Sequence, residues 1–416
     1  MSGHLLASGY QQLQSLPDIH VPLIGNRWAI GIFFLIHIVF GSFTMGTIFL
    51  SPTYQLLGRR RGDPRLERYA RNLGEVNIRI FSLGATFAGF AVILLTGLYP
   101  RFFIPLIEMF FWPALVAFLV WIPAIAALYL YVLQWDRLST RHPRLHLSLG
   151  YYAAGFEHIF LVMIVGIDSY LLTPGTGLGA FFNASYFPEL LHRFVGNISW
   201  ASFFIAGISA VRASASRGEM DRAYHAWATR VSMVVGFLTL LVQAVIGFFF
   251  AEAIKHASPG AFTYSVSGPV AWLWLVQGLL LAILLVGSNV YFQQTRPSPS
   301  GRLMTWAVIA LSVVAVAPAP LYPHGFHGVR YLVLTASILV SLAHFLAWRR
   351  DRQVPREREL ERAPRATMAV VALSALTIFL LMGIIRTTAR GEFTVYGKQT
   401  ESDSYGLYSP NKGHYP

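Results

Sequence analysis

The strongest constraint on the fold is a series of long apolar runs, and the first of them extends from Ala29 to Leu50. Its sequence, AIGIFFLIHIVFGSFTMGTIFL, contains no Asp, Glu, Lys or Arg over 22 residues. A helix of that length is about 33 Å long and crosses the hydrocarbon core of a bilayer. Because lipid offers the backbone no hydrogen bonds, an open chain crosses it only as helices. The run exceeds the length of a signal peptide, so we expect a retained span.

Mean hydropathy along the chain predicts about ten such spans. They cover residues 28 to 50, 77 to 98, 103 to 134, 148 to 172, 190 to 212, 225 to 252, 269 to 292, 303 to 320, 329 to 348 and 367 to 386. The third is too long for one upright helix and contains Pro113, so we expect an interfacial segment from Phe102 to Phe111 before the crossing. The eighth is weakened by Pro318 and Pro320.

The composition supports a membrane protein with a single domain. Hydrophobic residues make up 55% of the chain and charged residues 12%, whereas about a quarter of the residues in soluble domains are charged. We therefore expect an all-α polytopic membrane domain over residues 1 to 390, followed by a polar outer tail over 391 to 416. The mixed-charge stretch from Arg349 to Arg365 is expected to form a short cytoplasmic helix or hairpin.

The basic residues predict the orientation of the bundle. Of the 32 Lys and Arg residues, 21 fall in the connections that would lie on one side, among them Arg59 to Arg61 and Arg349 to Arg365. By the positive-inside rule this side is cytoplasmic and both termini are outside. The net charge of +13 is therefore a topology signal and does not indicate nucleic-acid binding, because the arginines are dispersed over loops that adjoin spans.

Polar residues inside the spans are the candidates for function. The chain has no cysteine, so disulfides, iron-sulfur clusters and covalent c-type haem are excluded within it, and a redox centre would use His, Met or carboxylate. His37 lies alone in the first run, where an imidazole costs several kcal/mol unless a metal ion, a haem iron or a hydrogen-bond partner takes its nitrogen. His192 opens the fifth span near the predicted outer surface. His158, after Glu157, is a deeper and separate candidate, and His344 is expected to be structural.

Four short motifs, in order over residues 28 to 212, carry a family resemblance. The stretch HIVFGSFTMG, from His37, resembles the first helix of subunit I of cytochrome bd-type quinol oxidases, where a haem-ligand histidine precedes Leu-Thr-x-Gly. The other three resemble the family's Trp-Asp-Arg-Leu, its Trp-Met-Gln-x-Pro with Phe-Asn, and its low-spin haem helix. They are WDRL from Trp135, YLLTP from Tyr170 with Phe182-Asn183, and HRFV from His192 with GISA from Gly207.

The resemblance implies that His37 and His192 are axial ligands of two different haems near the outer surface. It implies one or more haem b groups, with haem d as a further possibility. Arg390 is expected beside a haem propionate, with Arg193 and Arg386 as alternates; arginines that only reach to the membrane interface are the other interpretation. A second membrane subunit is expected, with quinol or an outer c-type cytochrome as electron donor. The location would be the cytoplasmic membrane of a bacterium or archaeon.

The later helices depart from the family pattern. Gln277 occupies the region in which the family has a haem-ligating methionine, and Thr387 occupies the position of its terminal haem-binding glutamate. The inner carboxylate positions of the third span hold Val116 and Ala124, and Glu108 matches one of them only with an insertion of about eight residues. The connection from Lys255 to Gly268 is too short for the family's quinol loop.

One outer loop offers a feature of its own, His324 and His327, which are spaced to share a helix face and bind a metal ion or a haem iron. An exposed polar loop is the alternative. Two functions therefore compete. The first is a haem-binding electron-transfer subunit of a cytochrome bd oxidase-like respiratory complex, in which oxygen reduction is undecided. The second is a haemless membrane scaffold or transporter that kept the helical bundle.

Overall fold

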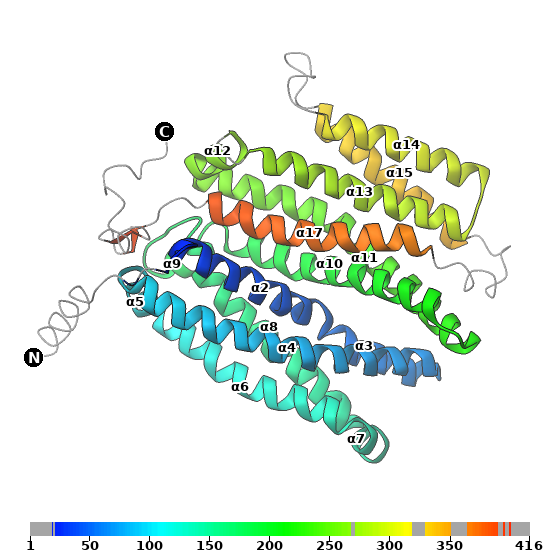
Figure 1. Cartoon of the computed structure of the whole chain (residues 1–416), viewed down its shortest axis with the longest axis horizontal. Coiled ribbons are helices and arrows are strands. Elements are labelled where there is room, and N and C mark those ends of the chain that lie inside the picture. The colour runs from blue at the N-terminus through cyan, green and yellow to red at the C-terminus, as the bar shows by residue number, and fades with distance from the viewer. Residues whose placement is uncertain are drawn as a thin grey trace, which may run out of the picture.

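The computed structural model describes residue 19 and residues 21–267, 271–317, 329–350, 364–389, 394–395 and 399–400. Within these residues, long helices run roughly along one axis (Figure 1). Ten helical segments in this part of the chain are long and apolar enough to cross a membrane, which confirms the predicted all-α polytopic fold. They are formed by α2 (Gly25–Thr47) continued by α3 (Leu50–Arg61), α4 (Pro64–Leu98), α6 (Phe111–Leu133), α8 (Pro143–Tyr170), α10 (Tyr186–Ala215), α11 (Glu219–Ala257), α13 (Trp272–Thr295), α14 (Pro299–Val316), α15 (Val329–Arg350) and α17 (Arg365–Ala389).

Shorter elements join the long helices. They are α5 (Pro100–Met109), α7 (Trp135–Arg141), α9 (Leu178–Phe181) and α12 (Pro259–Ser267), with a pair of two-residue antiparallel strands, β1 (Thr394–Val395) and β2 (Gln399–Thr400). Helix α5 confirms that the segment before the third crossing is separate. The break falls at Phe110, and Pro113 lies in the first turn of α6, where proline is tolerated.

The ends of several helices differ from those of the predicted spans. Helix α14 ends at Val316 and not at residue 320, because Ala317, which precedes Pro318, has an extended ψ of 137°. Helix α4 begins at Pro64 and not at residue 77, because its first turns are polar and hydropathy does not detect them. Most of the predicted connection from Arg349 to Arg365 lies outside the described residues.

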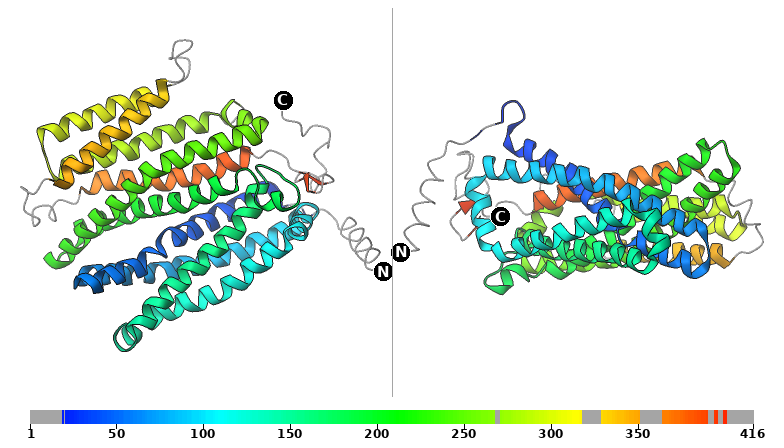
Figure 2. Two further views of the ribbon diagram at one scale, coloured as in Figure 1. Left: turned by 180° about the vertical axis from the view of Figure 1, so that it is seen from behind. Right: turned by 90° about the horizontal axis from the view of Figure 1, so that it is seen from below.

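Helix α10 is the centre of the bundle. It packs against α11, α17, α2 and α8, while α4 and α6 lie towards one edge and α14 and α15 towards the other (Figure 2). Close approach depends on small residues: a side chain at Gly46 would collide with the backbone of Asn197, and one at Gly207 would collide with Ala372 of α17. Such small-residue contacts are typical of helix packing in membranes.

One end of the bundle is basic. Arginines occupy the last turns of α3, α7, α10 and α15, which meet at this end (Figure 1). The turn into α4 is fixed by Gly62, whose φ is 61°, and by Asp63, whose side chain accepts a 3.0 Å hydrogen bond from the Arg65 backbone. The Arg65 guanidinium also donates to Asp63 and holds the pKa of that carboxyl below its usual value. The arrangement agrees with the predicted topology, whose sidedness stays a prediction.

Candidate functional site

His37 lies on α2 and faces α4. Its Nδ1 is 3.0 Å from the carbonyl oxygen of Gly84. Because a carbonyl oxygen can only accept, Nδ1 carries the proton and Nε2 keeps its lone pair. Metal-ligating histidines are usually fixed in this way, with one nitrogen donating and the other bound to the metal. A Cβ built on Gly41, one turn later on α2, would meet only His37 Cε1 within 4 Å, at 3.8 Å, so the space next to Gly41 is open on that side of the ring. The surroundings fit an axial ligand.

Aromatic side chains line the contact between α2 and α4, on which His37 lies. Phe33 and Phe40, which flank His37 by one turn on α2, each lie close to Phe87 of α4, with ring centroids 5.9 and 6.0 Å apart. Phe90 lies 5.8 Å from Phe33. The seam is therefore apolar, and a charge or dipole placed in it acts through a low dielectric.

His192 lies on α10 and faces α11. Its ring centroid is 5.3 Å from that of Phe250, and its Cε1 is 3.5 Å from the position of a Cβ built on Gly247. Its Nδ1 is buried and has no hydrogen-bond partner among the described residues. An unpaired buried nitrogen costs on the order of 1 to 3 kcal/mol. The ring is therefore suited to bind a metal ion through this nitrogen. No hydrogen bond to a described residue fixes the orientation of the ring, whereas the Gly84 carbonyl fixes that of His37.

His158 lies on α8 in a third helix contact. Its Nδ1 donates to the carbonyl of Ala154 at 2.8 Å, and its ring packs between Phe49 and Phe194 at 4.6 and 5.1 Å. The preceding residue, Glu157, is 1% exposed, and its Oε1 has no partner among the described residues. A buried carboxyl is thus present on α8, whereas the predicted carboxylate positions of the third span hold Val116 and Ala124.

The three histidines face different neighbours and form no common cluster. In the described part of the chain, no group of three or more His, Asp or Glu side chains could hold a metal ion. This does not bear on a haem, whose iron takes only one or two axial side chains.

Four charged side chains form a cluster at the end of the bundle opposite the basic end. Arg193 of α10 pairs with Asp168 at the end of α8 and, at 2.7 Å, with Glu189 one turn before it. Arg386 of α17 pairs with Asp168 at 2.8 Å and with Glu189 at 3.0 Å. Glu189 is only 1% exposed. The cluster ties three helices together beside His192, and both cations already have anionic partners.

The remaining predicted residues are scattered. Gln277 is 8% exposed on α13, and its Oε1 has no partner in the described part of the chain. Glu108 is exposed on α5, outside the ten spans. Arg390, His324 and His327 lie outside the described residues.

The sequence motif at the end of α8 forms a side-chain clasp. Thr173 donates to the Asn183 Oδ1 at 2.7 Å, and the Asn183 amide donates to Ser169 at 2.8 Å. Ser185 lies 2.7 Å from Thr173 and completes the group. These bonds hold the loop between α8 and α10, so this part of the motif positions the helix that carries His192.

His344 has the contacts expected of a structural histidine. It is 2% exposed, and its Nδ1 lies 2.9 Å from the Asn289 Oδ1. Asn289 in turn donates to Ser341 at 2.8 Å, so the three side chains join α13 to α15.

Sequence reasoning missed Gln243, Asp168 and Glu189 as parts of the surroundings of His192. Gln243 donates from Nε2 to the His192 carbonyl at 3.0 Å, and its own Oε1 is buried without a described partner. The four-residue spacing of Glu189 and Arg193 was a detectable signal of an ion pair on one helix face. The contributions of α8, α11 and α17 required the tertiary structure.

Comparison with known proteins gives one family and one fold. A family model described as cytochrome bd terminal oxidase subunit I matches residues 26–263. A solved structure titled "The structure of bd oxidase from Geobacillus thermodenitrificans" is similar, with a TM-score of 0.54 and 14% sequence identity over 88% of this chain and 95% of that chain. No curated protein sequence matches significantly. At this identity the structural match shows the fold alone.

Proposed function

The chain belongs to the cytochrome bd terminal oxidase subunit I family, and we propose that it is a haem-binding electron-transfer subunit in which His37 would bind the haem iron. One observation carries the proposal. The Gly84 carbonyl accepts a hydrogen bond from His37 Nδ1 at 3.0 Å, and Nε2 faces an apolar seam with no hydrogen-bond partner among the described residues. An imidazole in hydrocarbon with one nitrogen hydrogen-bonded is stabilised when its second nitrogen binds a metal ion.

We assign His192 to a second haem, on the support of its buried and unpaired Nδ1. The described part of the chain offers no obvious second ligand for it, and His324 and His327, the other predicted candidates, lie outside that part. Gln277 is on α13, and Met233 is fully buried in the main core, ten residues along α11 from Gln243, which contacts His192. Ten residues of helix span about 15 Å, so Met233 packs in the core at another level. From the described residues we therefore propose His192 alone as a protein ligand of that iron.

A bound haem supplies a reversible one-electron change at its iron. The residues of this chain hold it and set its surroundings: the Gly84 carbonyl orients His37, and the rings of Phe33, Phe40 and Phe87 keep water from the seam between α2 and α4. Arg193 is not a free partner for a propionate, because Asp168 and Glu189 already neutralise it. Arg390 keeps this role as a prediction.

The proposed setting is an oxidoreductase complex in the cytoplasmic membrane, with a second membrane subunit, quinol as the first candidate donor and an outer c-type cytochrome as another. The proposed haem is of type b. Oxygen reduction requires an open iron position and a proton supply. The predicted carboxylate positions of the third span hold Val116 and Ala124, and Glu108 is exposed, so electron transfer is the activity that we assign.

An absorption spectrum of the purified protein tests the proposal. We expect a dithionite-reduced minus oxidised spectrum with Soret and α bands, and we expect His37→Ala to remove the part that belongs to one haem. His192→Ala should remove a different part. His256→Ala is the matched control, because His256 is an exposed histidine on α11 and the spectrum should not change.

Two outcomes count against the assignment in different ways. A protein without these bands would support the haemless scaffold or transporter. Bands that survive both substitutions unchanged would leave haem binding in place and remove His37 and His192 as its ligands.

A further inference from the structure

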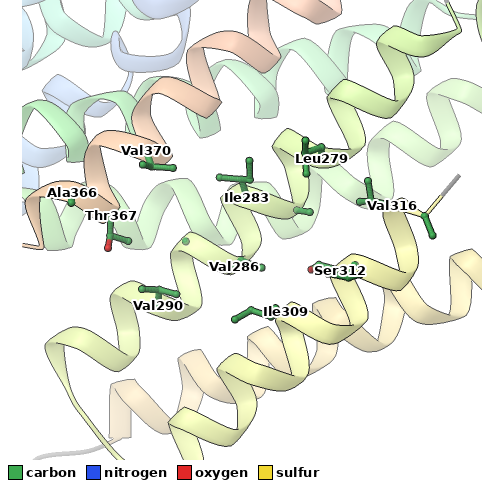
Figure 3. Close-up of a pocket in the computed structure, with 14 residues that line it drawn as sticks. Leu279, Ile283, Val286, Val290, Ile309, Ser312, Val316, Ala366, Thr367 and Val370 are labelled. Atoms are coloured by element: carbon green, nitrogen blue, oxygen red, sulfur yellow. The ribbon is translucent and has the colours of Figure 1, made fainter.

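An apolar groove crosses the lipid-facing side of the later helices (Figure 3). Helix α13 forms its floor, and α14 and α17 form its two walls, with a volume of about 780 Å³. Ile283 and Val286 of the floor, Ile309 of one wall and Val370 of the other point into it. Only two lining residues carry hydroxyls, Ser312 and Thr367, and the Thr367 hydroxyl donates to Gln294 at 2.8 Å. The walls therefore recognise hydrocarbon and offer almost nothing to a polar ligand.

The length of the groove suits a hydrocarbon chain. Along α13 the groove extends from Leu279 to Val290, a rise of about 16 Å at 1.5 Å per residue. This is about half the thickness of the hydrocarbon core of a bilayer, so the acyl chains of one leaflet can lie along it.

Positive charge stands at one end of the groove. Ala366 and Thr367 mark the end that lies at the basic end of the bundle, and Arg365 directly precedes them. Arg302 is seven residues, two helical turns, before the lining residue Ile309 and so lies on the same face of α14. Both arginines are exposed, and neither forms an ion pair with a described residue. Two guanidinium groups at the mouth of an apolar groove, without an ion pair in the described part of the chain, match a phosphate attached to acyl chains.

We propose that this groove binds an anionic phospholipid, with its acyl chains along α13 and its phosphate between Arg302 and Arg365. Any apolar face of the bundle is wetted by lipid, but a concave floor with two walls adds contacts that a flat face lacks. Basic groups at a membrane surface attract anionic lipid by an amount that corresponds, for two residues, to about a thirtyfold preference over a zwitterionic lipid. The proposal is independent of haem binding.

Native mass spectrometry of the full chain tests it with phosphatidylglycerol and phosphatidylcholine of identical acyl chains. We expect a one-to-one phosphatidylglycerol complex with about thirtyfold tighter binding. The double substitution Arg302→Gln and Arg365→Gln should abolish the preference and leave weak binding of both lipids. Arg349→Gln with Arg350→Gln, two exposed arginines at the same end of the bundle but away from the groove, should keep the preference.

A second variant tests the groove itself. Val286→Trp fills the floor and should remove both lipid complexes, and Val313→Trp serves the same purpose on an exposed wall position, 68% exposed, where folding is not at risk. Lipid binding that is unchanged in both variants would overturn the proposal. A preference that survives the loss of Arg302 and Arg365 would do the same. Loss of a companion subunit from the tryptophan variants, with lipid binding intact, would identify a protein helix as the occupant and also overturn it.

Discussion

His37 of α2 faces α4 in a contact lined by aromatic rings and makes no ion pair with a described residue. His192 of α10 faces α11 and directly precedes Arg193, which belongs to a cluster of four charges. The ring of His37 has its direction set by the Gly84 carbonyl. The ring of His192 has no such bond among the described residues, and the charges beside it hold its helix and not the ring. Both histidines cost free energy when they are buried in a membrane.

The difference shows two ways to prepare a histidine for a ligand. At His37 the protein fixes the ring and leaves one nitrogen available. At His192 the protein fixes the backbone, through the Asp168, Glu189, Arg193 and Arg386 cluster, and leaves the ring to be oriented by what it binds. Substitutions of the supporting residues should therefore act on different observables at the two sites.

The largest effect is expected for Arg386→Gln. This change leaves Glu189 and Asp168 with one cation in place of two, and an uncompensated buried carboxylate should cost about 3 kcal/mol of unfolding free energy. Thermal unfolding in detergent measures the loss. Hydrogen exchange should rise in the first turns of α10 and not around His37 on α2. The added change Glu189→Gln should restore part of the stability, and a purely additive loss would contradict the pairing.

An intermediate effect is expected from a matched pair of glycine substitutions. A Cβ at Gly84 would stand 3.0 Å from the Phe40 Cβ, so Gly84→Ala should push α4 from α2, lengthen the His37 hydrogen bond and cost about 1 to 2 kcal/mol. A Cβ at Gly247 would stand at 3.5 Å from His192, an ordinary contact, so Gly247→Ala should be neutral. Nitrogen NMR of labelled histidine reports both rings. Equal changes at the two rings would remove the distinction between them.

The smallest effect is expected for Gln243→Leu. The substitution removes the amide that donates to the His192 carbonyl, together with an Oε1 that has no described partner, so the net cost should stay below about 1 kcal/mol. Thermal unfolding again measures it, and the spectrum should keep its bands. A loss larger than that of Arg386→Gln would mean that Gln243, and not the charge cluster, holds His192 in place.

Most of the fold was predictable because membrane spans are continuous in sequence. Hydropathy gave the ten crossings, and the excess length before Pro113 indicated the separate helix α5. The first turns of α4 were missed because they are polar, and the early end of α14 depends on the restriction that Pro318 places on Ala317.

The candidate site was predictable only in part. An isolated imidazole and a short motif pointed to His37 and His192, but the carbonyl that orients His37 belongs to Gly84, 47 residues later and on another helix. The exposure of Glu108 and the full pairing of Arg193 likewise depend on which elements meet. The residue type indicates which side chains can bind iron. Which residues of other helices contact those side chains is known only from the tertiary structure.

The charge cluster beside His192 has a consequence for how the molecule responds to membrane voltage. Its two carboxylates and two guanidinium groups sum to zero net charge. A potential of 100 mV acts with about 2.3 kcal/mol on one elementary charge that crosses the membrane, and it exerts no net force on a neutral group. The charge cluster that joins α8, α10 and α17 should therefore be equally stable in an energised and a de-energised membrane. Removal of any one of the four charges would leave the cluster with a net charge, on which the membrane potential exerts a force.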